Sequence, residues 1–462
     1  MITKLRSYSS YKDTPLPWLQ ELPANWNMLR GKALFRPIDI RSRTGDEPLL
    51  TVSSARGVVR REEVNVTMFK AESYSGFKLC WPGDLVINSL WAWAGGLGFS
   101  AYHGIVSSAY SVFRLREGGS HAQKYYHYLI RSPSFQWELQ TRSKGIWISR
   151  LQITDDNFLN ILFPFPPLPE QRAIVKFLDW AERRVRFIVA ARKRRIQLLG
   201  EYRQALISDA VTGKFDVRTG KPYPSYKDSG VPWLGKVPEG WEIVRLKRLA
   251  RLAYGDSLPA NERQKGEVPV YGSNGPVGFH DRANTVAPVI IVGRKGSFGK
   301  IQYSAKPVFA IDTTFFIDKR YTDTDLRWLF YMLSQLELDR SSQDSAVPGL
   351  DREEAYQKLT VLPPFPEQRA IAEYLDRETE KIDAAIEKTK ESIALWEELR
   401  ETLISDVVTG KLDVREVAKR LPEEEPELEE KVKALDASLL GGESEESGAD
   451  SGRELEQAEE TT

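Results

Sequence analysis

The sequence predicts a mixed α/β protein built as a tandem pseudo-twofold repeat, with two variable domains separated by two long helices that form an antiparallel coiled coil. The six residues PEQRAI begin at Pro169 and again at Pro366, and the same offset of 197 positions relates LISDAVTGKFDVR to LISDVVTGKLDVR. A further pair, YKDTPLPWLQELPANW and YKDSGVPWLGKVPEGW, is offset by 215 positions. Because the repeated ends match while the middles differ in sequence and length, we infer a duplicated scaffold that carries two diverged domains.

The diverged middle of each copy is expected to be a compact α/β domain. GDLVINSLWAWAG and APVIIVGRKGSFG are typical of short buried strands that run into glycine-rich turns. YSVFRL and TTFFI predict further strands, and AQKYYHYLI and DLRWLFYML predict amphipathic helices at matching places in the two copies. We therefore expect domain 1 over residues 1–165 and domain 2 over residues 218–362.

A long helix is predicted after each domain, over residues 166–217 and 363–415. Proline precedes each helix and glycine follows it, as helix starts and stops require. Apolar residues recur with 4-3 spacing on both helices, which predicts a coiled-coil seam. The expected seam comprises Ile174, Leu178, Ala181, Val185, Ile188, Leu199, Tyr202 and Leu206 on the first helix and Ile371, Leu375, Ile382, Ala385, Trp396, Leu399 and Leu403 on the second.

Charge indicates how these helices pair. Residues 170–214 have a net charge of +6, whereas residues 367–411 have a net charge of −5. Opposite charges on two helices of equal length favour pairing within one chain, and a pseudo-twofold axis would make the pair antiparallel. We place Arg192 and Arg195 on the seam, facing Asp383 and Glu387.

The remaining composition limits the function. Residues 416–462 contain 16 acidic and 5 basic side chains, so we expect an acidic, disordered tail there and a basic body of a kind that polyanion binders need. The sequence has no apolar run long enough to span a bilayer, and its N-terminus lacks the core of a signal peptide, so the expected location is the cytoplasm. A single cysteine, Cys80, excludes intrachain disulfides and cysteine-rich zinc sites.

Polar and basic side chains among aromatic residues in the predicted loops are the candidate DNA contacts, because such groups can donate to phosphates and base edges. For each of them taken alone, an ordinary solvated loop residue is the alternative; His103 could likewise touch DNA or be structural. In domain 1 the candidates are Ser53, Ser54, Arg56, Asn88, Ser89, Trp91 and Ser107. In domain 2 they are Arg263, Lys265, Ser273, Asn274, Arg294, Lys295 and Ser297.

The duplicated unit resembles the specificity subunit of type I restriction-modification enzymes. The resemblance rests on PPLPEQRAI and PPFPEQRAI, on LISDAVTGK, and on WPGDLVINSLWAWAGGLG and VYGSNGPVGF in the middles, and it extends to Arg415. It implies that two target-recognition domains, held apart by the helices, each read one half of a bipartite double-stranded DNA target. It also implies a scaffold surface for other subunits at Pro169, Glu170, Gln171, Arg172, Pro366, Glu367, Gln368 and Arg369.

The partners that this resemblance implies carry the chemistry. Two modification subunits would be adenine-N6 methyltransferases that use S-adenosylmethionine, and the restriction subunits would use ATP and Mg²⁺ to translocate and cleave DNA. No cofactor is expected in this chain itself.

The catalytic inventory agrees with a non-catalytic subunit. GRKGSFGKI resembles a phosphate-binding loop, but Arg294 replaces its first glycine and Ile301 replaces the magnesium-binding hydroxyl residue. The Asn-Pro-Pro-aromatic motif of amino-methyltransferases and the Pro-Asp pair of many nucleases are both missing from the sequence. Two alternatives remain open: a single-chain methyltransferase or nuclease, and a coiled-coil adaptor with two protein-binding domains.

Overall fold

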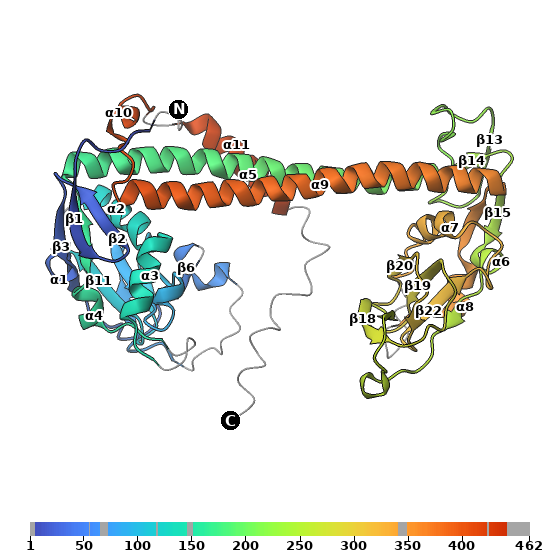
Figure 1. Cartoon of the computed structure of the whole chain (residues 1–462), viewed down its shortest axis with the longest axis horizontal. Coiled ribbons are helices and arrows are strands. Elements are labelled where there is room, and N and C mark those ends of the chain that lie inside the picture. The colour runs from blue at the N-terminus through green and yellow to red at the C-terminus, as the bar shows by residue number, and fades with distance from the viewer. Residues whose placement is uncertain are drawn as a thin grey trace. The chain divides into compact units, whose positions relative to one another are not determined.

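The chain forms two compact units in a computed structural model that describes residues 5–54, 56–64, 73–116, 119–145, 151–340, 349–422 and 425–440 (Figure 1). Unit 1 combines Met1–Arg194 with Lys390–Thr462, and unit 2 is Arg195–Thr389. Each unit therefore contains one variable domain and a part of both long helices. The mixed α/β fold class is confirmed.

Unit 1 is built on a four-stranded antiparallel sheet of order β4 (Phe35–Pro37), β11 (Ser111–Leu115), β8 (Asp84–Ile87) and β9 (Leu97–Phe99). Four strand pairs surround it: β1 (Tyr11–Leu16) with β2 (Leu19–Pro23), β3 (Asn27–Arg30) with β12 (Leu162–Phe165), β5 (Leu50–Ser53) with β6 (Gly57–Arg60), and β7 (Lys78–Cys80) with β10 (Gly104–Val106). The short helices are α1 (Gly31–Leu34), η2 (Arg61–Glu63), η3 (Ala92–Ala94), α2 (Gly119–Arg131), α3 (Pro133–Arg142) and α4 (Asp155–Leu159).

Unit 2 repeats this plan with a four-stranded sheet of order β16 (Ala253–Tyr254), β22 (Thr314–Asp318), β19 (Val289–Gly293) and β20 (Ile301–Ser304). Beside it lie β18 (Gly275–His280), β17 (Val268–Gly272) and β21 (Phe309–Ala310), together with the pairs β13 (Tyr226–Asp228) with β14 (Lys236–Pro238) and β15 (Glu242–Arg245) with β23 (Leu359–Leu362). Its short helices are α6 (Leu246–Leu249), η5 (Ala260–Glu262), α7 (Leu326–Leu333) and α8 (Arg352–Gln357).

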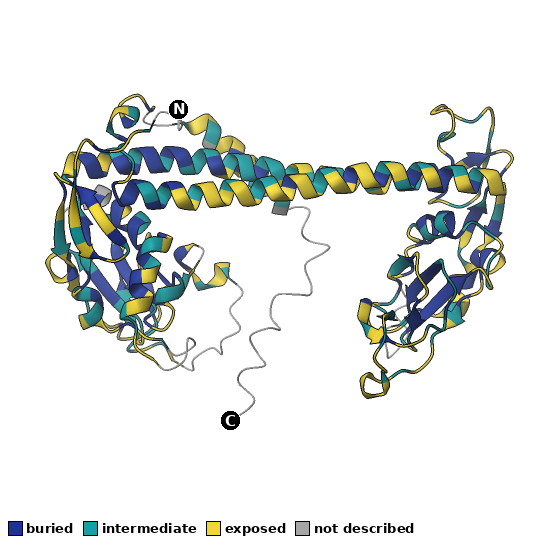
Figure 2. Ribbon diagram, in the orientation of Figure 1, coloured by how far each residue is buried: buried dark blue, intermediate teal, exposed yellow. Residues whose placement is uncertain are grey.

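One inner strand of each main sheet, β8 in unit 1 and β19 in unit 2, is buried on both faces. Burial on both faces explains its run of apolar residues. In β8, Leu85 and Ile87 join the large core of unit 1, whereas Val86 packs into a second, smaller cluster. In β19, Ile290 and Val292 join the large core of unit 2, and Val289 and Ile291 face a smaller cluster. These strands appear as dark blue arrows in Figure 2.

Two long helices, α5 (Leu168–Val211) and α9 (Phe365–Val408), each have 44 residues. In unit 1, Ile174 and Leu178 near the start of α5 share a core with Leu403 and Val407 near the end of α9. In unit 2, Leu206 and Ile207 near the end of α5 share a core with Ile371 and Leu375 near the start of α9. Within each unit the paired segments therefore run antiparallel.

The predicted seam is most fully buried where the helices enter a domain core. Tyr202 and Leu399, which were expected on the seam, are 58% and 39% exposed. A helix that packs against one other helix leaves much of its circumference to solvent, so the apolar spacing overestimates burial away from the cores.

The expected pairing of Arg192 and Arg195 with Asp383 is wrong. In unit 2 the Asp383 carboxylate pairs instead with Arg203, at 3.0 Å from Nε to Oδ1, and Arg195 is exposed. In unit 1 the Nε of Arg192 donates to the hydroxyl of Ser392 over 2.9 Å. The partner of Asp383 thus lies roughly two helical turns beyond the position that charge pattern alone suggested.

The expectation of a disordered tail from residue 416 is corrected for its first part. Helices α10 (Arg415–Ala418) and α11 (Pro426–Leu440) belong to unit 1, where Ala418 and Leu421 join the large core and Val432 is buried. Glu425 forms a two-pronged ion pair with Arg184 of α5, with both N–O distances at 2.6 Å. Arg186 of α5 lies 3.7 Å from Asp436, so two arginines of α5 pair with carboxylates of this acidic segment. Residues 423–424 and 441–462 of the predicted tail lie outside the described residues.

Each helix among the described residues is too short or too polar to cross a membrane.

Candidate nucleic-acid interface

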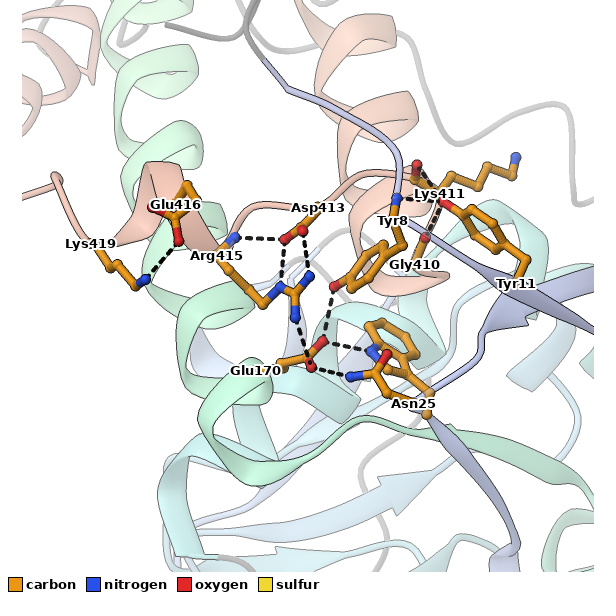
Figure 3. Close-up of polar contacts among 11 residues, drawn as sticks. Tyr8, Tyr11, Asn25, Glu170, Gly410, Lys411, Asp413, Arg415, Glu416 and Lys419 are labelled. Atoms are coloured by element: carbon orange, nitrogen blue, oxygen red, sulfur yellow. Dashed lines mark hydrogen bonds and ion pairs between the residues drawn. The ribbon is translucent and has the colours of Figure 1, made fainter.

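A buried glutamate joins domain 1 to α5 (Figure 3). The carboxylate of Glu170 accepts hydrogen bonds from the hydroxyl of Tyr8 over 3.1 Å and from the indole N–H of Trp26 over 2.7 Å, and Asn25 donates to its other oxygen. Arg415, which follows α9, lies 3.5 Å from the same carboxylate and also pairs with Asp413 at 2.6 Å. Three segments far apart in the sequence therefore meet at one acceptor.

The same junction occurs in unit 2. Glu367 accepts from the hydroxyl of Tyr223 and from the indole N–H of Trp241, each over 2.9 Å, and Arg218 lies 3.5 Å away. Arg218 pairs in turn with Asp216 at 2.8 Å. One donor differs, because the position of Asn25 is occupied in the second copy by glycine.

These junctions explain why PEQR, the YKD segment and the VTGK-DVR segment are all repeated. In unit 2 the end of the first copy docks on the start of the second, whereas in unit 1 the end of the second copy docks on the start of the first. Gly213 and Gly410 each adopt a positive φ where a Cβ atom would lie 2.5–2.6 Å from a proline ring, Pro238 and Pro23 respectively. Only glycine allows this close approach.

Burial and ionisation are linked at these junctions. Burial, followed by the charge of Glu170, raises the pKa of Tyr8 far above its ordinary value, and burial followed by the hydrogen bond to Glu367 does the same to Tyr223. Burial acts to raise the pKa of Asp413, but hydrogen bonds from Arg415 outweigh it and lower that pKa. The two tyrosines therefore remain neutral donors, and the carboxylate of Asp413 remains charged.

A second repeated contact fixes each domain helix against its long helix. In unit 1, Tyr128 donates to Asp179 of α5 over 2.8 Å. Tyr331 of α7 donates to Asp376 of α9 over 2.7 Å in unit 2. One turn earlier on each domain helix, a cation pairs with the same acceptor as the tyrosine: Lys124 pairs with Asp179, and Arg327 pairs with Asp376.

The predicted scaffold residues divide into buried and exposed groups. Glu170 is buried and Glu367 is half-buried. The amides of Gln171 and Gln368 are also buried and donate to the carbonyls of Pro166 and Pro363. The side chains left on the surface, where another subunit could reach them, are Pro169, Arg172, Pro366 and Arg369.

In domain 1 the candidate residues occupy neighbouring loops. Ser53, Ser54 and Arg56 lie at the β5–β6 turn, and the carbonyl of Ser54 accepts from Arg131, which also donates to the carbonyl of Leu97. This turn therefore lies beside the loop between β8 and β9. That loop and the following β10–β11 turn carry the other four candidates, Asn88, Ser89, Trp91 and Ser107.

Within domain 1 the candidates differ in what they can offer a ligand. The indole of Trp91 is 49% exposed and stacks on Trp93 with ring centroids 6.0 Å apart. Ser89 is buried and donates to the carbonyl of Ala109, so it positions the loop. Arg56 is exposed but already bonded to the carbonyl of Glu63.

In unit 2 the structure brings five candidates together at one end of the main sheet. Ser273 and Asn274 form the β17–β18 turn, and Arg294, Lys295 and Ser297 lie in the loop after β19. A Cβ atom on Gly293 would lie 2.1 Å from the Ser297 carbonyl and 3.2 Å from that of Ser273, so the two loops are in contact. Arg263 and Lys265 lie apart from this cluster, and Arg263 donates to the carbonyl of Val277 on β18.

Sequence reasoning missed the aromatic part of this cluster. The ring of Tyr254 is 48% exposed and has two guanidinium groups over it, Arg294 at 4.8 Å and Arg352 at 5.0 Å from its centroid. Lys300 donates to the side chain of Asn274 over 2.8 Å. Tyr254 and Arg352 are separated by 98 positions. The segment before Arg352 is tied to this cluster by a hydrogen bond from the backbone N–H of Leu350 to the carbonyl of Arg294 over 2.9 Å, which no local sequence pattern indicates.

Two histidines of domain 1 have different surroundings. His103 is exposed and packs against Trp81 with ring centroids 5.4 Å apart. His127 accepts a hydrogen bond at Nδ1 from the backbone N–H of Phe99. Burial, and then the positive charge of Arg131, lower the pKa of His127 to about 4, so it is neutral near pH 7.

Comparison with known proteins finds a matching family model and similar proteins. Residues 238–394 match the family described as "Type I restriction modification DNA specificity domain". The chain is 24% identical over 310 residues to the type I restriction enzyme MjaVIII specificity subunit of Methanocaldococcus jannaschii, a match that covers 60% of this chain and 68% of the relative. Residues 238–394 thus match a type I restriction modification DNA specificity domain, and the chain is similar to a type I restriction enzyme specificity subunit.

A second curated relative and a solved structure show the same similarity. The putative type I restriction enzyme MjaX specificity subunit of the same organism is 22% identical over 290 residues, which cover 58% of this chain and 63% of that relative. The chain thus aligns with about two thirds of the length of each of these relatives. A solved chain from work on complex assembly and conformational transition of the type I R-M system has a TM-score of 0.64 at 18% identity, covering 84% of this chain and 98% of that one, and shows the same fold.

Proposed function

We propose that this chain is the non-catalytic, sequence-specific DNA-binding subunit of a type I restriction-modification system. The observation that carries the proposal is the overlap between the matched DNA specificity domain, residues 238–394, and the Tyr254 cluster with its cations. Each domain reads one half of a bipartite target, because the duplication supplies two equivalent sheets with polar loops.

In unit 2 the reading surface consists of the cluster around Tyr254. Guanidinium and hydroxyl groups can donate to base edges, and the exposed cations Lys295 and Lys300 can contact phosphates. Tyr254 holds Arg294 and Arg352 in place by cation–π contacts, which reduces the entropy that these arginines lose on binding.

In unit 1 the corresponding surface is formed by Trp91 and the β5–β6 turn. An exposed indole stacked on a second one offers apolar contact to a thymine methyl group or a sugar. The loops of the two units share few residues, so the two half-sites should differ.

The catalytic partners follow from the family. Two modification subunits that methylate adenine at N6 with S-adenosylmethionine assemble on the scaffold, and restriction subunits add ATP- and Mg²⁺-dependent cleavage. The exposed Arg172 and Arg369 at the starts of α5 and α9 are the proposed contacts for these subunits.

The test is to express the chain with its modification subunit in a host free of adenine-N6 methylation and to map the modified adenines in the genome. The expected result is one bipartite motif with a fixed gap. Modified adenines without the chain, or a motif with no gap, would refute the proposal. The modification subunit expressed alone is the control.

A further inference from the structure

Unit 2 contains a groove that includes none of the candidate DNA contacts. It has a volume of about 840 Å³ and lies between α6, the segment that follows β22, and the start of α9. The cations along it are Lys247, Arg248, Arg251, Lys319 and Arg320. Its apolar part comprises Leu362, Pro363, Pro364 and Phe365.

Three of these cations are available to a ligand. Arg248 is paired with Glu242 at 2.8 Å, and Arg320 is paired with the buried Asp318. By contrast, the exposed ammonium groups of Lys247 and Lys319 have neither a hydrogen bond nor an ion pair among the described residues. Arg251, also exposed, contacts only the ring of Tyr321, at 5.9 Å.

The groove is remote from the proposed reading surface. Strand β22 begins at Thr314, beside the loop of Arg294, and ends at Asp318, beside the groove. Five residues of strand span roughly 14 Å. A duplex that lies on the reading loops at one end of this sheet is therefore not expected to fill a groove at the other.

The apolar wall favours a protein ligand over a nucleic acid. The ring of Phe365 is 50% exposed, and Leu362, Pro363 and Pro364 line the groove together with it. Binding of a DNA backbone owes its affinity mainly to contacts between cations and phosphates. Protein interfaces instead combine aromatic side chains with arginine. Lysine and arginine beside an exposed phenylalanine thus match a segment that carries both carboxylates and apolar side chains.

The same combination is repeated in unit 1. Helix α1 aligns with α6 at the offset of 215, which places Lys32 and Arg36 at the positions of Lys247 and Arg251. Leu168, at the position of Phe365, is 43% exposed. Residues of the same kinds at matching positions in the two units fit a partner that binds in two copies.

We propose that this groove, and its counterpart beside Leu168, each bind an acidic segment with apolar residues from one modification subunit. The proposal rests on the function proposed above, and it assigns to the recognition domains a role in assembly that is separate from reading DNA.

The test uses the full chain with Lys247→Glu and Lys319→Glu combined, and separately with Phe365→Ser. Lys306→Glu, at another exposed lysine of unit 2, is the matched control. Two affinities are measured for each variant: that for the purified modification subunit by titration calorimetry, and that of the chain alone for a duplex with the mapped target. Thermal unfolding shows whether each variant is folded.

The expected result is that both groove variants weaken binding of the modification subunit by roughly tenfold or more while DNA affinity stays within twofold of the control. A loss of DNA affinity in the charge-reversal variant would mean that the groove binds a DNA backbone and would overturn the proposal. Unchanged subunit affinity would overturn it as well. If the unmodified chain binds neither DNA nor the subunit, the proposed function itself fails, so the two failures are distinguishable.

Discussion

The indole N–H of Trp26 donates to the carboxylate of Glu170 over 2.7 Å and thereby ties the first residues of domain 1 to the start of α5. Trp241 and Glu367 repeat this bond over 2.9 Å in unit 2. Both tryptophans are almost fully buried. The duplication has thus preserved a tryptophan–glutamate hydrogen bond at each domain–helix junction.

The first prediction concerns this bond. Trp26→Phe leaves Glu170 with one donor fewer in a buried site, so we expect the free energy of unfolding of unit 1 to fall by about 1–3 kcal/mol from this loss, with the loss of ring volume adding to it. Urea unfolding followed by circular dichroism measures the change. Glu373→Gln, at an exposed carboxylate of α9, is the control and should alter stability little. Equal effects of the two substitutions would contradict the account.

The second prediction concerns His127. Burial and the cations Arg131 and Lys124 lower its pKa to about 4, against the opposing charge of Glu182. Because the unfolded chain binds a proton near pH 6.5 and the folded chain does not, His127 should reduce stability as the pH falls from about 6.5 to 4. His127→Phe, which copies Phe330 at the matching position of α7, should remove this part of the pH dependence. Unfolding midpoints at several pH values test it; an unchanged slope between pH 6.5 and 4 would count against it.

The third prediction concerns the C-terminal helix. Hydrogen bonds from Arg184 lower the pKa of Glu425, so the pair should stabilise α11 above the ordinary glutamate pKa of about 4.3 and lose its effect as the pH falls. Arg184→Glu should release α11 and speed proteolysis after residue 422 at pH 7. Arg369→Glu, on the exposed start of α9, is the control. Equal cleavage rates in the two variants would show that this ion pair does not hold the helix.

The fourth prediction concerns DNA. Arg294→Ala should weaken binding to the mapped target by roughly tenfold to a hundredfold, because a base-edge contact contributes about 1–3 kcal/mol. Tyr254→Ala should weaken it through the loss of the ring that positions Arg294 and Arg352. Lys306→Ala, away from the cluster, should change affinity less than twofold. Electrophoretic shifts at fixed salt give these ratios, and an Arg294→Ala chain that matches the control would remove this cluster from the reading surface.

Much of the architecture was predictable, because the repeated segments indicate the duplication and the apolar spacing predicts the long helices. Residues 366–408, for example, follow the spacing of a long helix and form most of α9. The register of the helix pair was not predictable from charge. Asp383 pairs with Arg203, in a register that also brings Leu206 and Ile371 into one core. The prediction of disorder from net charge was also wrong for residues 425–440. This acidic segment is helical, with Glu425 bonded to Arg184 and Val432 buried.

The candidate site was predictable in part. Arg294 and Ser297 follow a strand and a glycine-rich turn, which is a local pattern. Tyr254 lies on β16 and Arg352 on α8, so their contact depends on tertiary packing that no local sequence pattern indicates. In domain 1, sequence could not distinguish Ser89, which is buried and structural, from Trp91, which is exposed.

The most direct test of the central claim is a domain exchange read out by mapping of methylated adenines. Residues 27–165, from β3 to the end of its partner strand β12, are replaced by the corresponding domain of another specificity subunit, and the chimera is expressed with the modification subunit. If each unit reads its own half-site, the mapped motif should change in one half and keep the other half unaltered. A motif altered in both halves, or in neither, would contradict the account.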